Sequence, residues 1–221
     1  MIQNIYRDRI HAGEVLADIL LRADIVDPVV LALPRGGVPL GAIVARALDV
    51  PLDVILVRKI GLPGHEELAA GAVVDGNPPV TVFNPDVLRV RNLAEKDLAE
   101  IVTRKIREIN ERRLRYLAGA NPVPVEDKTA IIVDDGIATG ATALAAIRGL
   151  RARNPARIIL AVPVAARDSL ERLAPEVDEI ICPLVPEPFY VVGAYYTQFG
   201  QTSDDTVVDI LREFRKRPIS R

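Results

Sequence analysis

The sequence of 221 residues has few of the side chains that build metal sites and disulfides. It contains one cysteine, Cys182, and two histidines, so we expect neither an intrachain disulfide nor a structural zinc site. Its longest apolar run, residues 158–166, is well short of the ~18 residues that a bilayer-spanning helix needs. Residues 1–22 include acids where a signal peptide would be apolar, so the expected location is the cytoplasm, with no membrane partner.

An excess of positive charge is also lacking. The chain has 28 Lys and Arg against 30 Asp and Glu, a formal net charge of −2, and no basic block. Because nucleic-acid binding needs a surface that neutralises phosphates, no nucleic-acid partner is expected. Aromatic residues make up only 4% of the chain, yet five of them gather near the C-terminus: Phe189, Tyr190, Tyr195, Tyr196 and Phe199.

The remaining composition, 49% hydrophobic and 26% charged, is that of a folded globular protein. Short runs rich in Val, Ile and Leu alternate with helical patterns, and such continuous apolarity is typical of strands covered on both faces. The expected strands are residues 29–33, 52–57, 129–133, 157–162 and 179–184. The expected helices are residues 11–22, 38–48, 94–117, 142–153 and 167–173. The alternation predicts an α/β, doubly wound fold with a mostly parallel sheet.

Two segments depart from this alternation. Residues 58–92 contain Gly61, Pro63 and Gly64 followed by short apolar pieces, which predicts a flexible loop and then a hairpin or edge strands. Residues 186–221 hold the aromatic cluster and a helix capped by Asp204 or Ser203. We therefore expect a core over residues 1–185 and a small C-terminal hood over residues 186–221.

The most informative segment is residues 131–142, IIVDDGIATGAT, which predicts a strand, two acids, a small-residue loop and a helix. Ligands of parallel sheets bind beyond the carboxyl ends of strands, and a helix N-terminus with free N–H groups suits a phosphate. Two carboxylates would repel that phosphate, but they suit vicinal hydroxyl groups, which are hydrogen-bond donors. The plainer alternative is an ordinary turn whose acids cap the helix, which needs only one or two small polar residues.

This segment resembles the 5-phosphoribosyl 1-diphosphate (PRPP) binding motif of type I phosphoribosyltransferases, although Gly136 stands where that motif usually has an apolar residue. The resemblance implies that Asp134 and Asp135 hold the ribose hydroxyls. The loop and the start of the helix would then bind the phosphate, through Gly136, Ile137, Ala138, Thr139, Gly140, Ala141 and Thr142.

Two further elements agree with the resemblance. The sequence Pro34-Arg35-Gly36-Gly37 resembles the loop that holds pyrophosphate in these enzymes, and Arg58-Lys59 would place two cations over the diphosphate. The alternatives are an ordinary Gly-containing turn and a solvated strand end. The implied catalytic residues are Arg35, Arg58, Lys59 and Asp135, and the implied substrate-binding residues include Arg35, Gly36, Gly37, Phe189 and Tyr190.

The family implies transfer of the phosphoribosyl group of PRPP to a nucleobase or related N-heterocycle, with release of pyrophosphate. It also implies Mg²⁺ bound mainly through the diphosphate and waters, a loop over residues 60–67 that closes on the site, and a homodimer. Phe189 and Tyr190 would stack on the base, or the aromatic cluster packs the C-terminal helix or a dimer contact.

The base itself is not predicted. Residues 57–71 resemble adenine phosphoribosyltransferases, but Leu68-Ala69-Ala70-Gly71 lacks the acid of that family, and Ala138 replaces the Asp of 6-oxopurine enzymes. A non-catalytic PRPP- or nucleotide-sensing regulator on the same fold is the alternative. Regulators can lose the cations on the pyrophosphate side, whereas this chain keeps Arg35, Arg58 and Lys59, which favours an enzyme.

Overall fold

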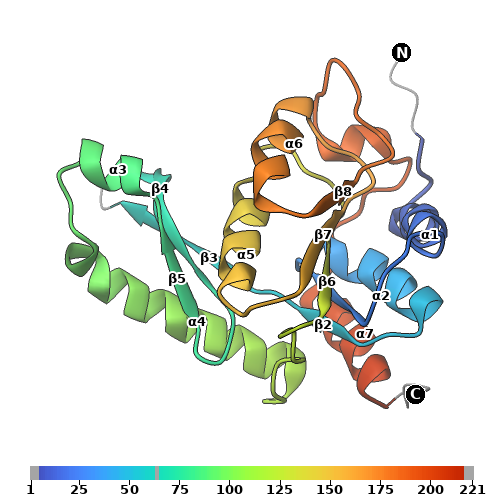
Figure 1. Ribbon diagram of the computed structural model, residues 1–221, viewed down its shortest axis with the longest axis horizontal. Helices are drawn as coiled ribbons and strands as arrows, with labels where there is room; N and C mark the ends of the chain where they lie inside the picture. Colours follow the sequence, from blue (N-terminus) through green and yellow to red (C-terminus); the bar gives the residue numbers. More distant parts are fainter. Residues whose placement is uncertain (1–4, 63–64, 217–221) are drawn as a thin grey trace.

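The apolar runs form a five-stranded parallel sheet at the centre of the computed structural model, which describes residues 5–62 and 65–216 (Figure 1). The strand order is β2-β1-β6-β7-β8, and Val30 of β1 pairs with Ile131 of β6. The strands are β1 (Pro28–Ala32), β2 (Leu52–Val54), β6 (Thr129–Val133), β7 (Arg157–Ala161) and β8 (Glu179–Ile181). The predicted α/β fold with a mostly parallel sheet is confirmed.

Helices cover both faces of this sheet, because successive strand residues point to opposite sides. Val30 and Ile131 pack in the cluster beneath α1 (Arg9–Leu20), α2 (Gly37–Leu48) and α7 (Asp204–Lys216). Leu31 and Ile132 pack in a second cluster beneath α5 (Ala141–Arg151) and α6 (Arg167–Leu173). Both faces are therefore buried, as continuous apolar strands require.

A second sheet, antiparallel and three-stranded, lies beside this core with the order β3-β4-β5. It consists of β3 (Val57–Leu62), β4 (His65–Val74) and β5 (Val80–Phe83), and is followed by α3 (Pro85–Val90), a 3-10 turn (Glu95–Leu98) and α4 (Ala99–Leu117). Figure 1 shows this lobe, in green, projecting from one side of the parallel sheet.

The expected loop over residues 60–67 is wrong, because Ile60 pairs with Gly71 and Leu62 with His65 across an antiparallel hairpin. Ile60 and Leu62 are buried, so their burial outweighs the loop signal of the neighbouring glycines. Pro63 and Gly64 lie outside the described residues. The expected strand over residues 52–57 is divided: β2 ends at Val54 and β3 begins at Val57.

One arginine ties the lobe to the core. Arg113 of α4 donates to Asp53 of β2 over 3.0 Å and also to Asp75, which follows β4. Both acids are only 3% exposed, and Asp53 accepts a second bond from the N–H of Val123. Burial raises the pKa of Asp75, and the charge of Arg113 opposes that rise.

The C-terminal segment returns across the carboxyl ends of the strands. It contains a 3-10 turn (Val192–Tyr195) and then α7, which Ser203 caps by accepting a hydrogen bond from the N–H of Thr206. Of the two caps considered, Ser203 is the one used, and the Asp204 side chain is free for other contacts. The division at residue 185 remains a prediction. In the described residues, no helix combines the length and apolarity that crossing a bilayer demands.

We predict that Arg113→Met lowers the free energy of unfolding by ~3–5 kcal/mol, because it leaves two buried carboxylates without their cation. Urea denaturation measures the change. Arg107→Met, on the exposed side of the same helix, is the matched control and should change stability by less than ~0.5 kcal/mol. Equal effects of the two substitutions would show that the buried ion pairs do not hold the lobe.

Candidate functional site

The loops after β1 and β6 touch at the carboxyl edge of the parallel sheet. From β1 the chain proceeds to β2 on one side, whereas β6, β7 and β8 follow on the other, so the strand order reverses between β1 and β6. Such a reversal is where open α/β sheets bind ligands. A Cβ at Gly37 would lie 2.4 Å from the carbonyl oxygen of Val133, and one at Gly36 would lie 2.0 Å from Oδ2 of Asp135. Only glycines allow the two loops to approach this closely.

The acid pair has one oxygen committed on each side chain. Oδ1 of Asp134 accepts the N–H of Asp135 over 2.9 Å. Oδ2 of Asp135 accepts Nε and Nη2 of Arg9 over 2.9 and 2.7 Å. The other two oxygens, Asp134 Oδ2 and Asp135 Oδ1, accept no hydrogen bond from the described part of the chain. Neither oxygen is fully buried, so both are at least partly accessible to a ligand.

Burial makes this pair unusual electrostatically. Burial, and then the neighbouring Asp135 carboxylate, raise the pKa of Asp134. Burial also raises the pKa of Asp135, while the hydrogen bonds and charge of Arg9 lower it. Arg9 offsets part of the repulsion between the two carboxylates, and a donor-rich ligand or a further cation would offset more of it.

The loop that follows presents its N–H groups outward. Among residues 136–142, the N–H groups of Ala138, Thr139, Gly140, Ala141 and Thr142 donate to no acceptor within the described residues, and all of these residues except Gly140 are exposed. The carbonyls point the other way: Ser169 Oγ donates to that of Ala138 over 2.6 Å, and Arg172 to that of Thr139 over 3.2 Å. Gly140 has a φ of +70°, which lets the chain enter α5.

One residue of the predicted phosphate loop does not fit its role. The N–H of Ile137 donates to the carbonyl of Val164 over 2.9 Å, and the side chain is 3% exposed. Ile137 therefore anchors the loop to the core, and the expectation that its amide binds an anion is wrong. On either side of this anchor, the N–H of Gly136 and the N–H groups from Ala138 to Thr142 donate to no acceptor within the described residues.

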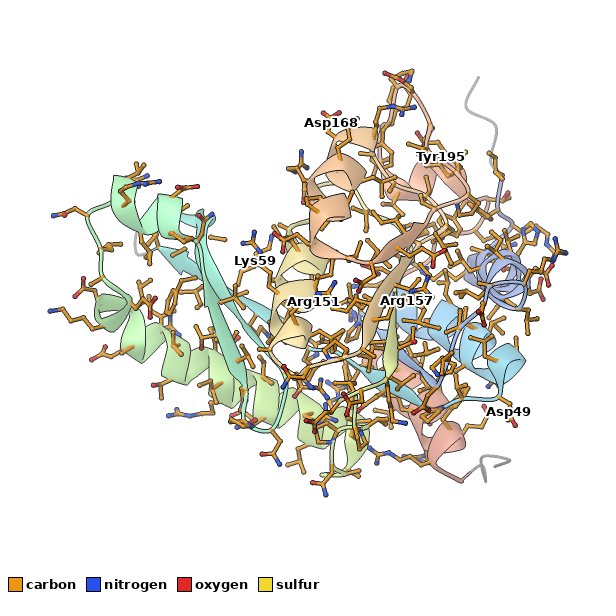
Figure 2. All side chains as sticks on the ribbon, viewed as in Figure 1. Asp49, Lys59, Arg151, Arg157, Asp168 and Tyr195 are labelled. Carbon is orange, nitrogen blue, oxygen red and sulfur yellow. The ribbon has the colours of Figure 1, made fainter. Side chains whose placement is uncertain are left out.

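The three predicted cations separate onto two sides of β3. Arg58 Nε lies 3.5 Å from Glu108 of α4, and Arg35 Nη1 lies 4.0 Å from Asp204 at the start of α7. Lys59, on the other face of the strand, lines a cavity of about 120 Å³ beside Ala141 of α5 (Figure 2). The sequence had predicted that Arg58 and Lys59 lie together over one anion. In the structure they point to opposite faces of β3 and do not. Lys59 lies instead by the first turn of α5.

Sequence analysis missed the groups that surround Asp204. Its carboxylate accepts Arg112 Nη2 over 2.9 Å and Arg115 Nη1 over 2.7 Å, and it also accepts the Tyr116 hydroxyl. These hydrogen bonds lower the pKa of Asp204. The hydrogen bond from Tyr116 has the largest effect. The arginine-rich end of α4 was visible in the sequence, but nothing local indicated a partner about 90 residues away. Arg9 was missed for the same reason.

The aromatic cluster divides between packing and exposure. Tyr195 and Tyr196 are 4% and 3% exposed and belong to the core. The ring of Tyr196 packs against the ring of Tyr6. Phe189 is half-buried against Tyr195, with ring centroids 5.6 Å apart, whereas Tyr190 is 62% exposed. Contact of Phe189 and Tyr190 with a base remains a prediction.

Comparison with known proteins agrees with the geometry. Residues 1–191 match the family model described as the phosphoribosyl transferase domain. A protein of Mycobacterium tuberculosis, provisionally named as a phosphoribosyl transferase, is 42% identical over 207 residues, which are 94% of this chain. These residues are 46% of that protein, so the chain spans less than half the length of this relative.

Solved structures share the fold. A protein of Thermus thermophilus is 40% identical with a TM-score of 0.84, over 95% of this chain and 98% of its own. A hypothetical protein of Neisseria gonorrhoeae, solved with bound ppGpp, is 13% identical with a TM-score of 0.54, over 96% and 98% of the two chains. The second likeness shows the fold alone.

The close approach of the two loops leads to a prediction about Gly36. Gly36→Ala forces its methyl group against the Asp135 carboxylate and should lower the free energy of unfolding by ~1–3 kcal/mol, as overpacking does. Gly200→Ala is the control, because a Cβ there meets no atom within 4 Å among the described residues. Chemical denaturation of both variants tests the contact, and a Gly36→Ala protein as stable as Gly200→Ala would contradict it.

Proposed function

The chain belongs to the phosphoribosyl transferase domain family, and we propose that it transfers the phosphoribosyl group of PRPP to a nitrogen of a nucleobase or related N-heterocycle. The observation that carries the proposal is the pairing of two ligand-binding features in adjacent positions. Five unpaired N–H groups, from Ala138 to Thr142, lie next to two unpaired carboxylate oxygens on Asp134 and Asp135. A sugar phosphate needs both, donors for its dianion and acceptors for its hydroxyls.

The sugar phosphate would bind along this segment. Its 5′-phosphate would accept hydrogen bonds from the amides at the start of α5, where the helix dipole adds about half a positive charge. Its two ring hydroxyls would donate to Asp134 Oδ2 and Asp135 Oδ1. The hydroxyls of Thr139 and Thr142 are exposed on the same turn and can donate to the phosphate as well.

The bond that breaks in the reaction joins C1′ to the diphosphate oxygen. As it lengthens, positive charge grows on the sugar ring and negative charge on the departing pyrophosphate. The acceptor nitrogen then bonds to C1′, and its proton passes to the pyrophosphate or to water. Arg35 and Arg58 are the cations on the leaving-group side of the acid pair, and they would stabilise that negative charge. The negative charge of the Asp134 and Asp135 carboxylates would attract the positively charged sugar ring and keep it in the site.

The residues present fit magnesium only as an ion that arrives with the diphosphate. Among the described residues, no cluster of three or more His, Cys, Asp or Glu side chains encloses a metal position. Mg²⁺ commonly keeps several waters and binds substrate phosphates rather than an all-protein cage, so the diphosphate and waters would be its main ligands here. When bound, the ion would neutralise part of the charge on the pyrophosphate.

The alternative is a regulator that binds PRPP or a nucleotide without turnover. One observation favours it: Arg35 and Arg58 each face a carboxylate, Asp204 and Glu108, which offsets part of the charge that a leaving group needs. Isothermal calorimetry with PRPP and a pyrophosphate-release assay over a panel of bases separate the two functions. PRPP binding without pyrophosphate release on any base would establish the regulator.

The acid pair provides a direct test of sugar binding. Asp134→Asn and Asp135→Asn should each weaken PRPP binding by ~1.5–3 kcal/mol, because hydrogen bonds to a charged acceptor are lost. Asp18→Asn, on the exposed face of α1, is the control and should bind PRPP as the unmodified protein does. Unchanged calorimetric affinity in both acid-pair variants would show that the ribose is held elsewhere.

The cations provide a test of catalysis. Arg35→Gln should reduce the rate of pyrophosphate release about 10²–10³-fold, the usual effect of removing one electrostatic donor from a transition state. Arg46→Gln, which removes a surface ion pair with Glu213, is the control of equal charge change. A normal rate in Arg35→Gln would assign charge stabilisation to other groups.

A further inference from the structure

Arg9 holds one of the two carboxylate oxygens of Asp135. Arg9 donates to its Oδ2 through Nε over 2.9 Å and through Nη2 over 2.7 Å. The exposed fractions of the two side chains are only 13% and 16%, so water offers little competition for these bonds. A charged pair with two hydrogen bonds of this length has a well-defined orientation. Oδ1 is the oxygen that remains for a ligand.

Arg9 is itself fixed by the C-terminal segment. Its Nη1 donates to the carbonyl of Gly200 over 2.6 Å, and its guanidinium lies 4.0 Å from the centroid of the Phe199 ring. The backbone of Arg9 is fixed as well, because Arg9 is the first residue of α1. Asp8 caps this helix by accepting the N–H of His11 over 2.9 Å. All three guanidinium nitrogens therefore have a protein acceptor, and the side chain has a single position.

The same C-terminal segment also contacts the backbone of Asp135. The Tyr196 hydroxyl donates to the main-chain carbonyl of Asp135 over 2.6 Å. Residues 196–200 thus fix Asp135 twice, directly through Tyr196 and indirectly through Arg9. An arrangement with this many bonds determines which carboxylate oxygen points outward, in addition to holding the loop in place.

We propose that Arg9 is a positioning residue for sugar binding, which occupies Oδ2 of Asp135 so that Oδ1 alone is presented to one ribose hydroxyl. This inference rests on the proposed function. A carboxylate without Arg9 can rotate, and the ligand must then restrict that rotation when it binds. Together with Asp134, whose Oδ1 is occupied by a backbone N–H, the arrangement leaves two oxygens for two vicinal hydroxyls.

The test compares PRPP binding and pyrophosphate release in Arg9→Gln, Arg9→Lys and Arg9→Ala. We expect Arg9→Gln to bind PRPP roughly 2- to 10-fold more weakly, because the ligand must then restrict a carboxylate that Arg9 no longer orients. Arg9→Lys keeps the charge but has one donor nitrogen in place of the fork, and should recover only part of the affinity. Arg7→Gln is the matched control, since Arg7 is a nearby surface arginine whose side chain is 72% exposed.

Chemical rescue distinguishes positioning from a structural role. In Arg9→Ala, methylguanidinium well below denaturing concentration should restore PRPP affinity, because the small cation can occupy the space beside Oδ2. Urea denaturation is measured on the same samples. Lost stability that methylguanidinium does not repair, with PRPP affinity unchanged per folded molecule, would overturn the proposal and leave Arg9 as an anchor of the C-terminal segment.

A second variant addresses the support of Arg9. Phe199→Leu removes the ring beneath the guanidinium while keeping an apolar side chain, and should weaken PRPP binding less than Arg9→Gln does. The double variant should show less than the sum of the two effects, because both act through Asp135. Additive effects would contradict the proposal. Failure of the unmodified protein to bind PRPP would instead refute the proposed function.

Discussion

Adjacent strands β1 and β6 bring two loops of opposite charge into contact, and the close approach of their backbones is the constraint from which the site follows. The loop after β1 carries Arg35, and the loop after β6 carries two carboxylates. Gly36 and Gly37 remove the side chains that would separate them. Since the strands are fixed by the parallel sheet and its two buried faces, the chain holds the two loops together without any contact from a ligand.

The hydrogen-bonding groups of the site also have defined directions. The acid pair has one oxygen of each carboxylate bound within the protein and one open to solvent, and the following turn has its carbonyls bound by α6 while its amides stay unpaired. Acceptors and donors thus face outward in sequence along the same short segment. Arg9 and the amide of Asp135 each bind one carboxylate oxygen, which restricts the orientation of both acids.

The sequence predicted the central sheet and the turn between β6 and α5 because each depends on local pattern. Apolar runs such as residues 129–133 must be buried on both faces, which indicates a central strand. The conformation of the turn that follows depends mainly on the residues within it. The hairpin of β3 and β4 was missed because Gly61, Pro63 and Gly64 are typical of loops, whereas the pairing of Ile60 with Gly71 depends on long-range burial. The partners of Asp135 and Asp204 were also beyond prediction, since Arg9 and Arg112 lie 126 and 92 residues away.

The two sides of the site therefore rest on different parts of the structure. The side proposed to bind the sugar belongs to the sheet and to α1 and α5, all packed on the parallel core. The side proposed for the leaving group depends on α4, whose position is set by Arg113 between two buried acids and by Asp204 at the start of α7. Arg58 faces α4 through Glu108, so its position relative to the acid pair follows from how the lobe sits on the core. The positions of Arg35 and Arg58 consequently depend on ion pairs between layers, whereas the positions of the acid pair and the following amides depend on the backbone of the parallel core and on Arg9.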